Sequence, residues 1–253
     1  MRTFIFCLSF LCVYSAAAAF ADEAAPGYTD TPFIPGSQWR IHDQTRPQPP
    51  KVKAGTGCLG ATPPSDAVVL FDGKDLSQWT GKNLVIEDGT FNIKKTGGIA
   101  TKQEFGNLQL HLEWKSGTEK EDRMHWGNSG VFLLGGDIEV QIIQSCDSFI
   151  YADGNAGAVY GQSPPLVNPA RPAGEWESFD IYFTAPKFEN EKQTAPPRLT
   201  IIYNGVLVQN NIEVIGTTGH KTLPQPITKT KGAVSLQEHG SDVWFRNIWI
   251  RAL

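Results

Sequence analysis

The chain has 253 residues, a formal net charge of −4 at pH 7 and a hydrophobic content of 40%. This length is ordinary for one all-β domain with a sizeable core, so we expect a single domain with an N-terminal extension. The acidic balance and the lack of a basic stripe argue against nucleic acid and anionic membrane surfaces as main partners. A neutral small molecule or a glycan is the better expectation, and seven Trp and six Tyr are compatible with stacking on sugars.

Residues 1–21 have the pattern of a cleaved secretory signal peptide. Arg2 gives a basic start, an apolar run covers residues 4–20, and a small-residue cleavage site ends at Ala21. A membrane anchor is less favoured, because the run is short and no stop-transfer pattern follows it. The sequence therefore predicts a secreted or periplasmic protein, cleaved near Ala21 and without membrane insertion.

Residues 22–64 are rich in Pro, Gly, Thr and charged side chains. Because proline fixes φ and lacks an N–H donor, this stretch cannot form a regular helix or a central strand. Phe33, Ile34, Trp39 and Ile41 would gain from burial. We expect an extended arm that docks on the following domain.

Two of the four cysteines, Cys7 and Cys12, would leave with the signal peptide. An oxidising compartment permits a disulfide between Cys58 and Cys146, and a pair of free thiols is the alternative. Neither cysteine has the CxxC spacing of a zinc site.

Residues 65–253 contain short apolar runs between Gly, Asn and Pro turns, which is typical of an all-β sandwich or barrel. The run 108–115 alternates strictly between apolar and polar residues, and Asn204-Gly205 predicts a tight hairpin turn. Loops are expected at 94–101, 117–126 and 216–231. The expected strands cover residues 68–71, 90–93, 108–115, 131–134, 138–144, 179–184, 199–203, 206–210, 232–238 and 243–251.

Two of these strands carry polar side chains at alternate positions. In residues 138–142 the apolar side chains share one face, which leaves Glu139 and Gln141 together on the other. Residues 232–238 repeat the design with Gln237, and His239 continues the row. A solvated outer sheet face is the ordinary alternative, but two such strands together would line one concave wall able to hold a sugar.

His239 and Tyr160 are the other candidates for chemistry. His239 precedes a Gly-Ser-Asp turn, so a neighbour at a strand end can orient its imidazole, unless it is a surface or structural histidine. Tyr160 follows small residues that allow a ligand to approach; its phenol would donate to a sugar oxygen or a developing enolate, or it is a core tyrosine. His125, in a charged loop, and His111, on a polar strand face, are weaker candidates.

Three further residues are candidates for substrate binding. Asn128 belongs to the polar stretch before residues 131–134. Trp176 is either a packing indole or a sugar-stacking one. Arg246 either pairs with a carboxylate such as Glu139 or is an outer-face cation.

Several classes of enzyme are excluded by the absence of their motifs. The sequence has no nucleophile elbow, phosphate-cradling Gly loop or dinucleotide fingerprint. It has no HExxH or other regular metal-ligand spacing, so no cofactor is assigned and a divalent metal is left open.

Seven motifs in order resemble the 3-keto-disaccharide hydrolase domain family, whose fold is related to laminarinase-like hydrolases and concanavalin-like lectins. The resemblance covers about residues 68–253, and residues 28–32 and 39–43 resemble a leader of secreted members. It departs at Glu177, where many members carry Asn, and at the Pro-rich residues 186–197. The motifs are Leu70-Phe71-Asp72-Gly73-Lys74-Asp75-Leu76-Ser77-Gln78-Trp79, Gly127-Asn128-Ser129-Gly130-Val131-Phe132, Glu139-Val140-Gln141, Gly157-Ala158-Val159-Tyr160-Gly161, Gly174-Glu175-Trp176, Leu236-Gln237-Glu238-His239-Gly240 and Phe245-Arg246-Asn247-Ile248.

The resemblance implies a jelly-roll β-sandwich of two antiparallel sheets and a secreted enzyme that cleaves 3-keto-glycosides. Cleavage would proceed by removal of the C2 proton, elimination and hydration. The resemblance implies Glu139, His239 and Tyr160 as catalytic residues. It implies Asn128, Gln141, Gln237, Trp176 and Arg246 as substrate-binding residues.

A non-catalytic carbohydrate-binding module remains the alternative function. Such a module would use the same sandwich and the same polar face, but it would not need a base at Glu139 or His239. Glu139 also lacks the clustered acidic partners that an ordinary two-carboxylate glycosidase requires.

Overall fold

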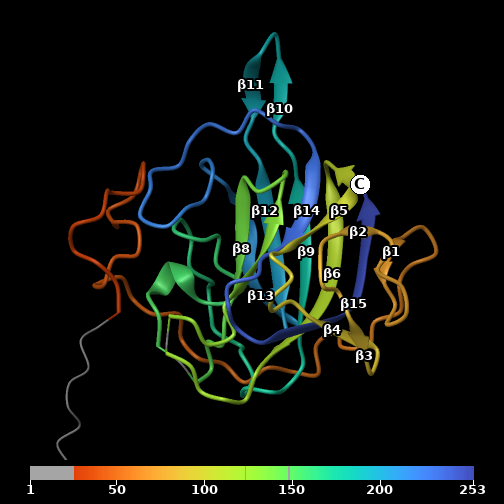
Figure 1. The fold of residues 1–253 in the computed structure, drawn as a ribbon. Coiled ribbons are helices and arrows are strands. Elements are labelled where there is room, and N and C mark those ends of the chain that lie inside the picture. Colours follow the sequence, from red (N-terminus) through yellow and green to blue (C-terminus); the bar gives the residue numbers. More distant parts are fainter. Residues whose placement is uncertain (1–25, 123, 148) are drawn as a thin grey trace, which may run out of the picture.

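Two antiparallel β-sheets pack face to face in the computed structural model, and the segment before them runs along their outside (Figure 1). The structure describes residues 26–122, 124–147 and 149–253, so the predicted signal peptide lies outside the described residues. Within these ranges one helix is found, the short 3-10 helix η1 (Ala152–Gly154). The architecture confirms the predicted all-β jelly-roll sandwich.

The larger sheet has eight strands, and β15 lies at its centre with β6, β4 and β1 as neighbours. The main path is β13 (Val206–Glu213), β12 (Arg198–Tyr203), β9 (Glu177–Thr184), β6 (Leu108–Ser116), β15 (Val243–Ala252), β4 (Thr90–Asn92) and β3 (Ile86–Glu87), with β1 (Val68–Phe71) paired to β15.

The smaller sheet has five strands and carries the candidate site. Its order is β2 (Trp79–Thr80), β5 (Ile99–Phe105), β14 (Gly232–Leu236), β7 (Ser129–Leu133) and β8 (Ile138–Ile142). A separate hairpin, β10 (Lys187–Glu189) with β11 (Lys192–Ala195), projects from the body in Figure 1.

Strict alternation on β6 places its apolar residues in the core between the sheets. Leu108, Leu110, Leu112 and Trp114 are all buried there. Burial of each such side chain stabilises the fold by about 1.5–3 kcal/mol before the entropy cost of ordering the chain.

The ten predicted strands are present, with ends shifted by a few residues, while β2, β3, β5, β10 and β11 were not predicted. The expected loop at 94–101 is wrong at its end, because Ile99 begins β5. Lys102, Gln103 and Glu104 make this strand polar and hide its period, yet β2 and β14 pair with it on both sides.

The Asn204-Gly205 hairpin is confirmed, since Tyr203 pairs with Val206 and both turn residues have positive φ.

The segment before β1 docks on the sandwich, and we call residues 26–64 the arm. Ile34 and Ile41 are buried as expected, while Phe33 is 52% exposed with the Arg40 guanidinium 4.0 Å from its ring centroid. In Figure 1 the arm starts beside the 3-10 helix and then passes below the sheets toward β1.

The arm also covers the polar face of β6, which the alternation alone would leave in solvent. Glu113 is fully buried and accepts hydrogen bonds from the Gly60 N–H at 2.5 Å and from Asn247 Nδ2 at 2.9 Å. Burial would raise the pKa of Glu113, but hydrogen bonds from His111, Asn247 and Gly60 outweigh it and hold the pKa at about 2.

Two further features of the described residues bear on the expectations above. Cys58 and Cys146 are both free thiols. None of the described helices has the length and apolar character needed to span a membrane.

Candidate active site

A cavity of about 610 Å³ opens on the five-stranded sheet and brings together most of the predicted site residues. Its walls come from β7, β8, the loop at 216–231, the segment around the 3-10 helix and the arm. The predicted residues that line it are Asn128, Glu139, Gln141, Tyr160, Gln237 and His239.

The register of the sheet explains why the two polar rows meet. β7 lies between β8 and β14, and residues directly opposite each other on neighbouring strands share a face. Glu139 lies opposite Phe132, and Gln141 lies opposite Gly130. The Gly130 carbonyl accepts the N–H of Gln237 at 3.0 Å, which brings the second row to the same wall.

Glu139 supplies the carboxyl group among the residues that line the cavity. It is 7% exposed, and its carboxyl oxygens have no hydrogen-bond partner among the described residues, although its backbone N–H donates to Thr218 Oγ1 at 2.9 Å. Burial without a compensating partner raises the pKa of Glu139 to about 8. Near neutral pH this group is therefore able both to take up and to release a proton.

Two buried amide oxygens in the cavity have no donor within the described part of the chain, Oε1 of Gln141 and Oε1 of Gln237. The Gln141 Nε2 group donates to Asn128 Oδ1 at 3.4 Å, and Asn128 Nδ2 donates to the Met124 carbonyl at 2.9 Å. A buried acceptor without a donor costs roughly 1–3 kcal/mol. Hydroxyl groups of a bound sugar would satisfy both amides.

Tyr160 lies beside β8, where its backbone N–H donates to the Glu139 carbonyl at 3.1 Å, and its side chain is at the centre of a hydrogen-bonded chain. Its hydroxyl is 2.7 Å from that of Tyr151 and 3.1 Å from His220 Nδ1. Burial raises the pKa of Tyr160 well above its usual value, and burial together with the nearby His42 lowers the pKa of His220. Tyr160 is therefore protonated at neutral pH and can donate a hydrogen bond.

Two histidines stand at the rim of the cavity. The rings of His125 and His239 are 5.9 Å apart, and His125 Nδ1 lies 2.8 Å from Asp122 Oδ2. The backbone carbonyl of His125 accepts a hydrogen bond from the Ser241 hydroxyl, which ties the two loops together. The structure thus brings His125 beside His239, although the sequence favoured only the latter.

Trp176 and Arg246 do not reach this cavity. Arg246 lies opposite Glu113 on the larger sheet, and its Nε donates to Glu113 Oε2 at 2.6 Å. The suggested pairing of Arg246 with Glu139 is wrong, because the two residues belong to different sheets. Trp176 packs against Arg246, with the guanidinium carbon 4.1 Å from its ring centroid.

Four polar residues that line the cavity were not singled out from the sequence: Tyr28, Tyr151, Thr218 and His220. Thr218 and His220 come from the segment at 216–231, which was expected only to form a loop. Tyr28 belongs to the arm, and no local sequence pattern relates it to β8.

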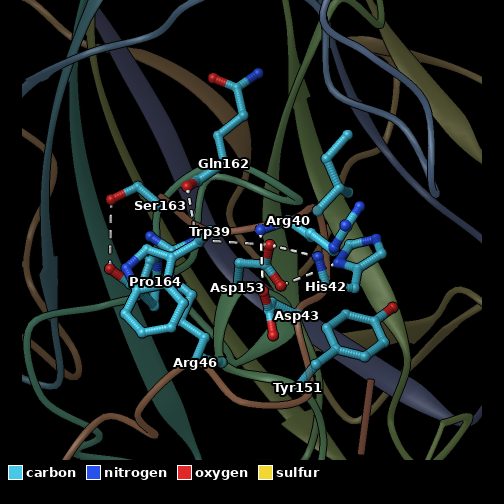
Figure 2. A network of polar contacts seen from close by, with 12 residues as sticks. Trp39, Arg40, His42, Asp43, Arg46, Tyr151, Asp153, Gln162, Ser163 and Pro164 are labelled. Atoms are coloured by element: carbon cyan, nitrogen blue, oxygen red, sulfur yellow. Dashed lines mark hydrogen bonds and ion pairs between the residues drawn. The ribbon is translucent and has the colours of Figure 1, made fainter. Parts of the chain in front are cut away.

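The arm is fixed to the wall by a buried histidine and aspartate. His42 Nδ1 lies 3.0 Å from Asp153 Oδ1, and the His42 backbone N–H donates to Asp153 Oδ2 at 2.9 Å (Figure 2). Both side chains are fully buried. The His42 ring lies 4.0 Å from that of Tyr151 and 4.7 Å from that of Tyr160, measured between centroids.

A second cavity, of about 670 Å³, adjoins the first over β14 and β5. Phe132 and Gln237 line both cavities. The polar face of the smaller sheet therefore offers two neighbouring compartments, of which only the first contains Glu139.

Metal ligands are not grouped in the described part of the chain. Across residues 26–122, 124–147 and 149–253 no three His, Cys, Asp or Glu side chains are arranged to hold a metal ion.

Comparison with known proteins relates the chain to one family of carbohydrate-active proteins. The model of the 3-keto-alpha-glucoside-1,2-lyase-like domain matches residues 66–251. A relative named 3-keto-disaccharide hydrolase, from Bacteroides thetaiotaomicron, is 25% identical over 240 residues, which cover 74% of this chain and 78% of the relative.

Solved structures from Parabacteroides distasonis share the fold. One candidate glycosyl hydrolase is 40% identical with a TM-score of 0.74, over 86% of this chain and 99% of that protein. Another is 26% identical with a TM-score of 0.54, over 74% of this chain and 99% of that protein.

Proposed function

The chain belongs to the 3-keto-alpha-glucoside-1,2-lyase-like family, and from this premise we propose that it cleaves 3-keto-glycosides by elimination followed by hydration. The observation that carries the proposal is Glu139, a buried carboxyl group with a pKa raised to about 8 in a cavity of hydrogen-bonding groups. An exported location, secreted or periplasmic, is part of the proposal and rests on the signal-peptide pattern alone.

The ketone of the substrate explains why one carboxyl group is enough to cleave the glycosidic bond. A carbonyl at C3 of the sugar acidifies the hydrogen on C2, because the resulting carbanion is an enolate whose charge lies on O3. The C2–H electrons then form the C1–C2 double bond as the C1–O bond breaks, and the aglycone oxygen leaves with a proton. Addition of water across this double bond, OH at C1 and H at C2, gives the free 3-keto sugar.

Glu139 is proposed as the group that exchanges the C2 proton. A base is most effective when its pKa is near the working pH, and general acid–base catalysis contributes typically about 10²–10⁴-fold to a rate. The raised pKa makes ionised Glu139 a stronger base than an exposed carboxylate. The proton that it takes from C2 is then available for return during hydration.

Tyr160 is proposed to stabilise the enolate, since it is protonated and already held by Tyr151 and His220. Gln141, Gln237 and Asn128 are proposed to hold the sugar hydroxyls, because two of their buried acceptors lack donors in the described structure.

His239, with His125 beside it, is proposed to protonate the leaving oxygen at the rim. Their position between solvent and the cavity suits a group that must recover a proton after each turnover. The adjoining cavity behind Phe132 and Gln237 offers space for the aglycone.

The test is release of a chromogenic aglycone from a 3-keto-α-glucoside by the mature protein in deuterated water, with and without a chelator. We expect release with deuterium at C2 of the product, and loss of release by about 10²-fold or more in Glu139→Gln. Glu104→Gln is the matched control, because Glu104 is exposed on β5 away from the cavity. Loss of release with the chelator alone would add a divalent metal to the reaction.

A non-catalytic carbohydrate-binding module is the outcome that would replace this proposal. It would bind the same 3-keto-glucoside without release, and Glu139→Gln would then change only the affinity.

A further inference from the structure

The arm reaches the candidate active site although it precedes the matched family domain. The family model begins at residue 66, yet Tyr28 lines the cavity together with Tyr151, Tyr160 and His220. The arm therefore covers the outer face of the larger sheet and also forms part of the cavity wall.

The arm is anchored by the buried carboxylate of Asp153, which contacts three groups of the arm. Asp153 Oδ2 accepts the backbone N–H of His42 and lies 3.7 Å from Arg46 Nη1, and Asp153 Oδ1 lies 3.0 Å from His42 Nδ1 (Figure 2). Arg46 also donates to the Gln162 carbonyl at 3.1 Å. Contacts of a buried carboxylate with charged or polar donors are among the stronger hydrogen bonds in proteins, so this end of the arm is held firmly.

The anchor is connected to Tyr28 through the backbone. The Tyr28 N–H donates to the His42 carbonyl at 2.8 Å, and the Gln44 N–H donates to the Tyr28 carbonyl at 3.3 Å. Gly27 permits this close pairing, because its φ is +125° and a Cβ there would lie 2.5 Å from the His42 carbonyl oxygen. The position of Tyr28 thus follows from the position of His42.

The ring of Tyr28 is half-buried and forms part of an aromatic wall. It meets the His220 ring edge-on at 5.7 Å and lies 6.1 Å from the Tyr151 ring. The Lys221 ammonium sits 3.3 Å from the ring centroid. A tyrosine ring at a cavity wall combines an apolar face for the C–H groups of a pyranose with a hydroxyl for its oxygens.

We infer that Tyr28 is a substrate-binding residue that contacts the sugar ring of the 3-keto-glycoside, and that His42 with Asp153 is the positioning pair that holds it there. This inference rests on the proposed function and extends the active site beyond residues 66–251 to the arm.

The first test compares Tyr28→Ala with Tyr28→Phe in the full mature chain. Loss of an aromatic contact worth about 0.5–1.5 kcal/mol predicts that Tyr28→Ala raises KM up to about tenfold and changes kcat by less than about threefold. Tyr28→Phe, which keeps the ring, should recover most of the affinity. Phe33→Ala is the control, because Phe33 is an exposed aromatic residue of the same arm outside the cavity.

The second test asks whether Asp153 acts through Tyr28. Asp153→Asn should raise KM, whereas Asp30→Asn, an exposed change of the same kind on the arm, should not. In the double variant Tyr28→Ala/Asp153→Asn the KM should be no higher than in Tyr28→Ala alone, since coupled residues are not additive. Additive effects on KM, or an effect of Asp153→Asn only on the melting temperature, would overturn the positioning role.

A binding measurement keeps this inference separate from the proposed function. Calorimetric titration of methyl 3-keto-α-glucoside into Glu139→Gln, with and without Tyr28→Ala, reports affinity where turnover is blocked. Weaker binding in the double variant supports the role of Tyr28 even if the wild-type protein releases no aglycone. Equal binding with and without the Tyr28 ring overturns it even if the wild-type protein is active, and absence of both binding and release overturns both proposals.

Discussion

The carboxyl group of Glu139 lies over the bare Cα of Gly130 on the neighbouring strand. A Cβ at Gly130 would lie 2.7 Å from Glu139 Oε1 and 3.1 Å from its Cγ. The glycine at position 130 of β7 is therefore explained by the space that the carboxyl group occupies.

Gly130→Ala should displace this carboxyl group while leaving the sheet intact. Because misplacement of a catalytic group by about 1 Å can cost on the order of 10²-fold, we expect kcat/KM for the 3-keto-glucoside to fall by about tenfold or more. Gly55→Ala is the control, since a Cβ there meets nothing within 4 Å and its φ is not positive. Equal activity of the two variants at equal melting temperature would show that the position of Glu139 is not critical.

The pH dependence of turnover should follow the ionisation of Glu139. If the ionised carboxylate removes the C2 proton, kcat/KM rises with pH and levels off above the pKa of about 8. Incorporation of deuterium at C2 should follow the same profile. A profile that falls through this range instead would assign Glu139 as the proton donor and a histidine as the base.

Glu139→Gln should stabilise the fold at alkaline pH. The pKa of Glu139 in the folded chain, about 8, lies above the ordinary value of 4.5, so the folded state holds a proton that the unfolded state has lost. The free energy of unfolding therefore decreases as pH rises from about 4.5 to 8, because ionisation favours the unfolded chain. Melting curves of the variant and the wild type should coincide near pH 4 and separate at pH 8, with the variant melting higher.

The two unpartnered amide oxygens predict a loss of affinity rather than of rate. Gln141→Leu and Gln237→Leu each remove an acceptor that a sugar hydroxyl would satisfy. KM should rise by about tenfold in each, as expected for a hydrogen bond worth about 1–1.5 kcal/mol, and the apo protein should be no less stable. A fall in kcat without a change in KM would give these amides a role in the reaction itself.

Much of the fold was predictable because it depends on local alternation. Strict alternation at 108–115 identified β6 and its core face, and Asn204-Gly205 identified the turn between β12 and β13. The polar rows on β8 and directly after β14 also met as expected, since β7 pairs with β8 and the Gly130 carbonyl accepts the Gln237 N–H. Short strands such as β2 and β3 gave no periodic signal, because two residues define no period.

Arg246 and Trp176 were predicted at the site but lie outside the cavity, Arg246 beside Glu113. Their placement shows what the alternation of polar and apolar residues cannot decide. Glu139 and Glu113 both stand at polar positions of alternating strands, and the sequence does not show which face each sheet turns to the cavity. The arm covers Glu113 and leaves Glu139 at a cavity, and that difference arises from residues far away in the chain. Tyr28 was missed for the same reason, since its contact with the site depends on the distant Asp153.

Arg246 should prove structural, and its replacement makes the clearest contrast with the cavity variants. Arg246→Gln removes a hydrogen bond to buried Glu113, whose pKa of about 2 lies below the ordinary 4.5. The stability that Glu113 contributes is present above about pH 4.5 and is lost as pH falls toward 2, so the variant should lose most stability near neutral pH. We expect a lower melting temperature at pH 7, a smaller difference at pH 3, and kcat/KM within about twofold of wild type at 25 °C. A large fall in kcat/KM with an unchanged melting temperature would instead support a substrate-binding role for Arg246 and for Trp176, which packs against it.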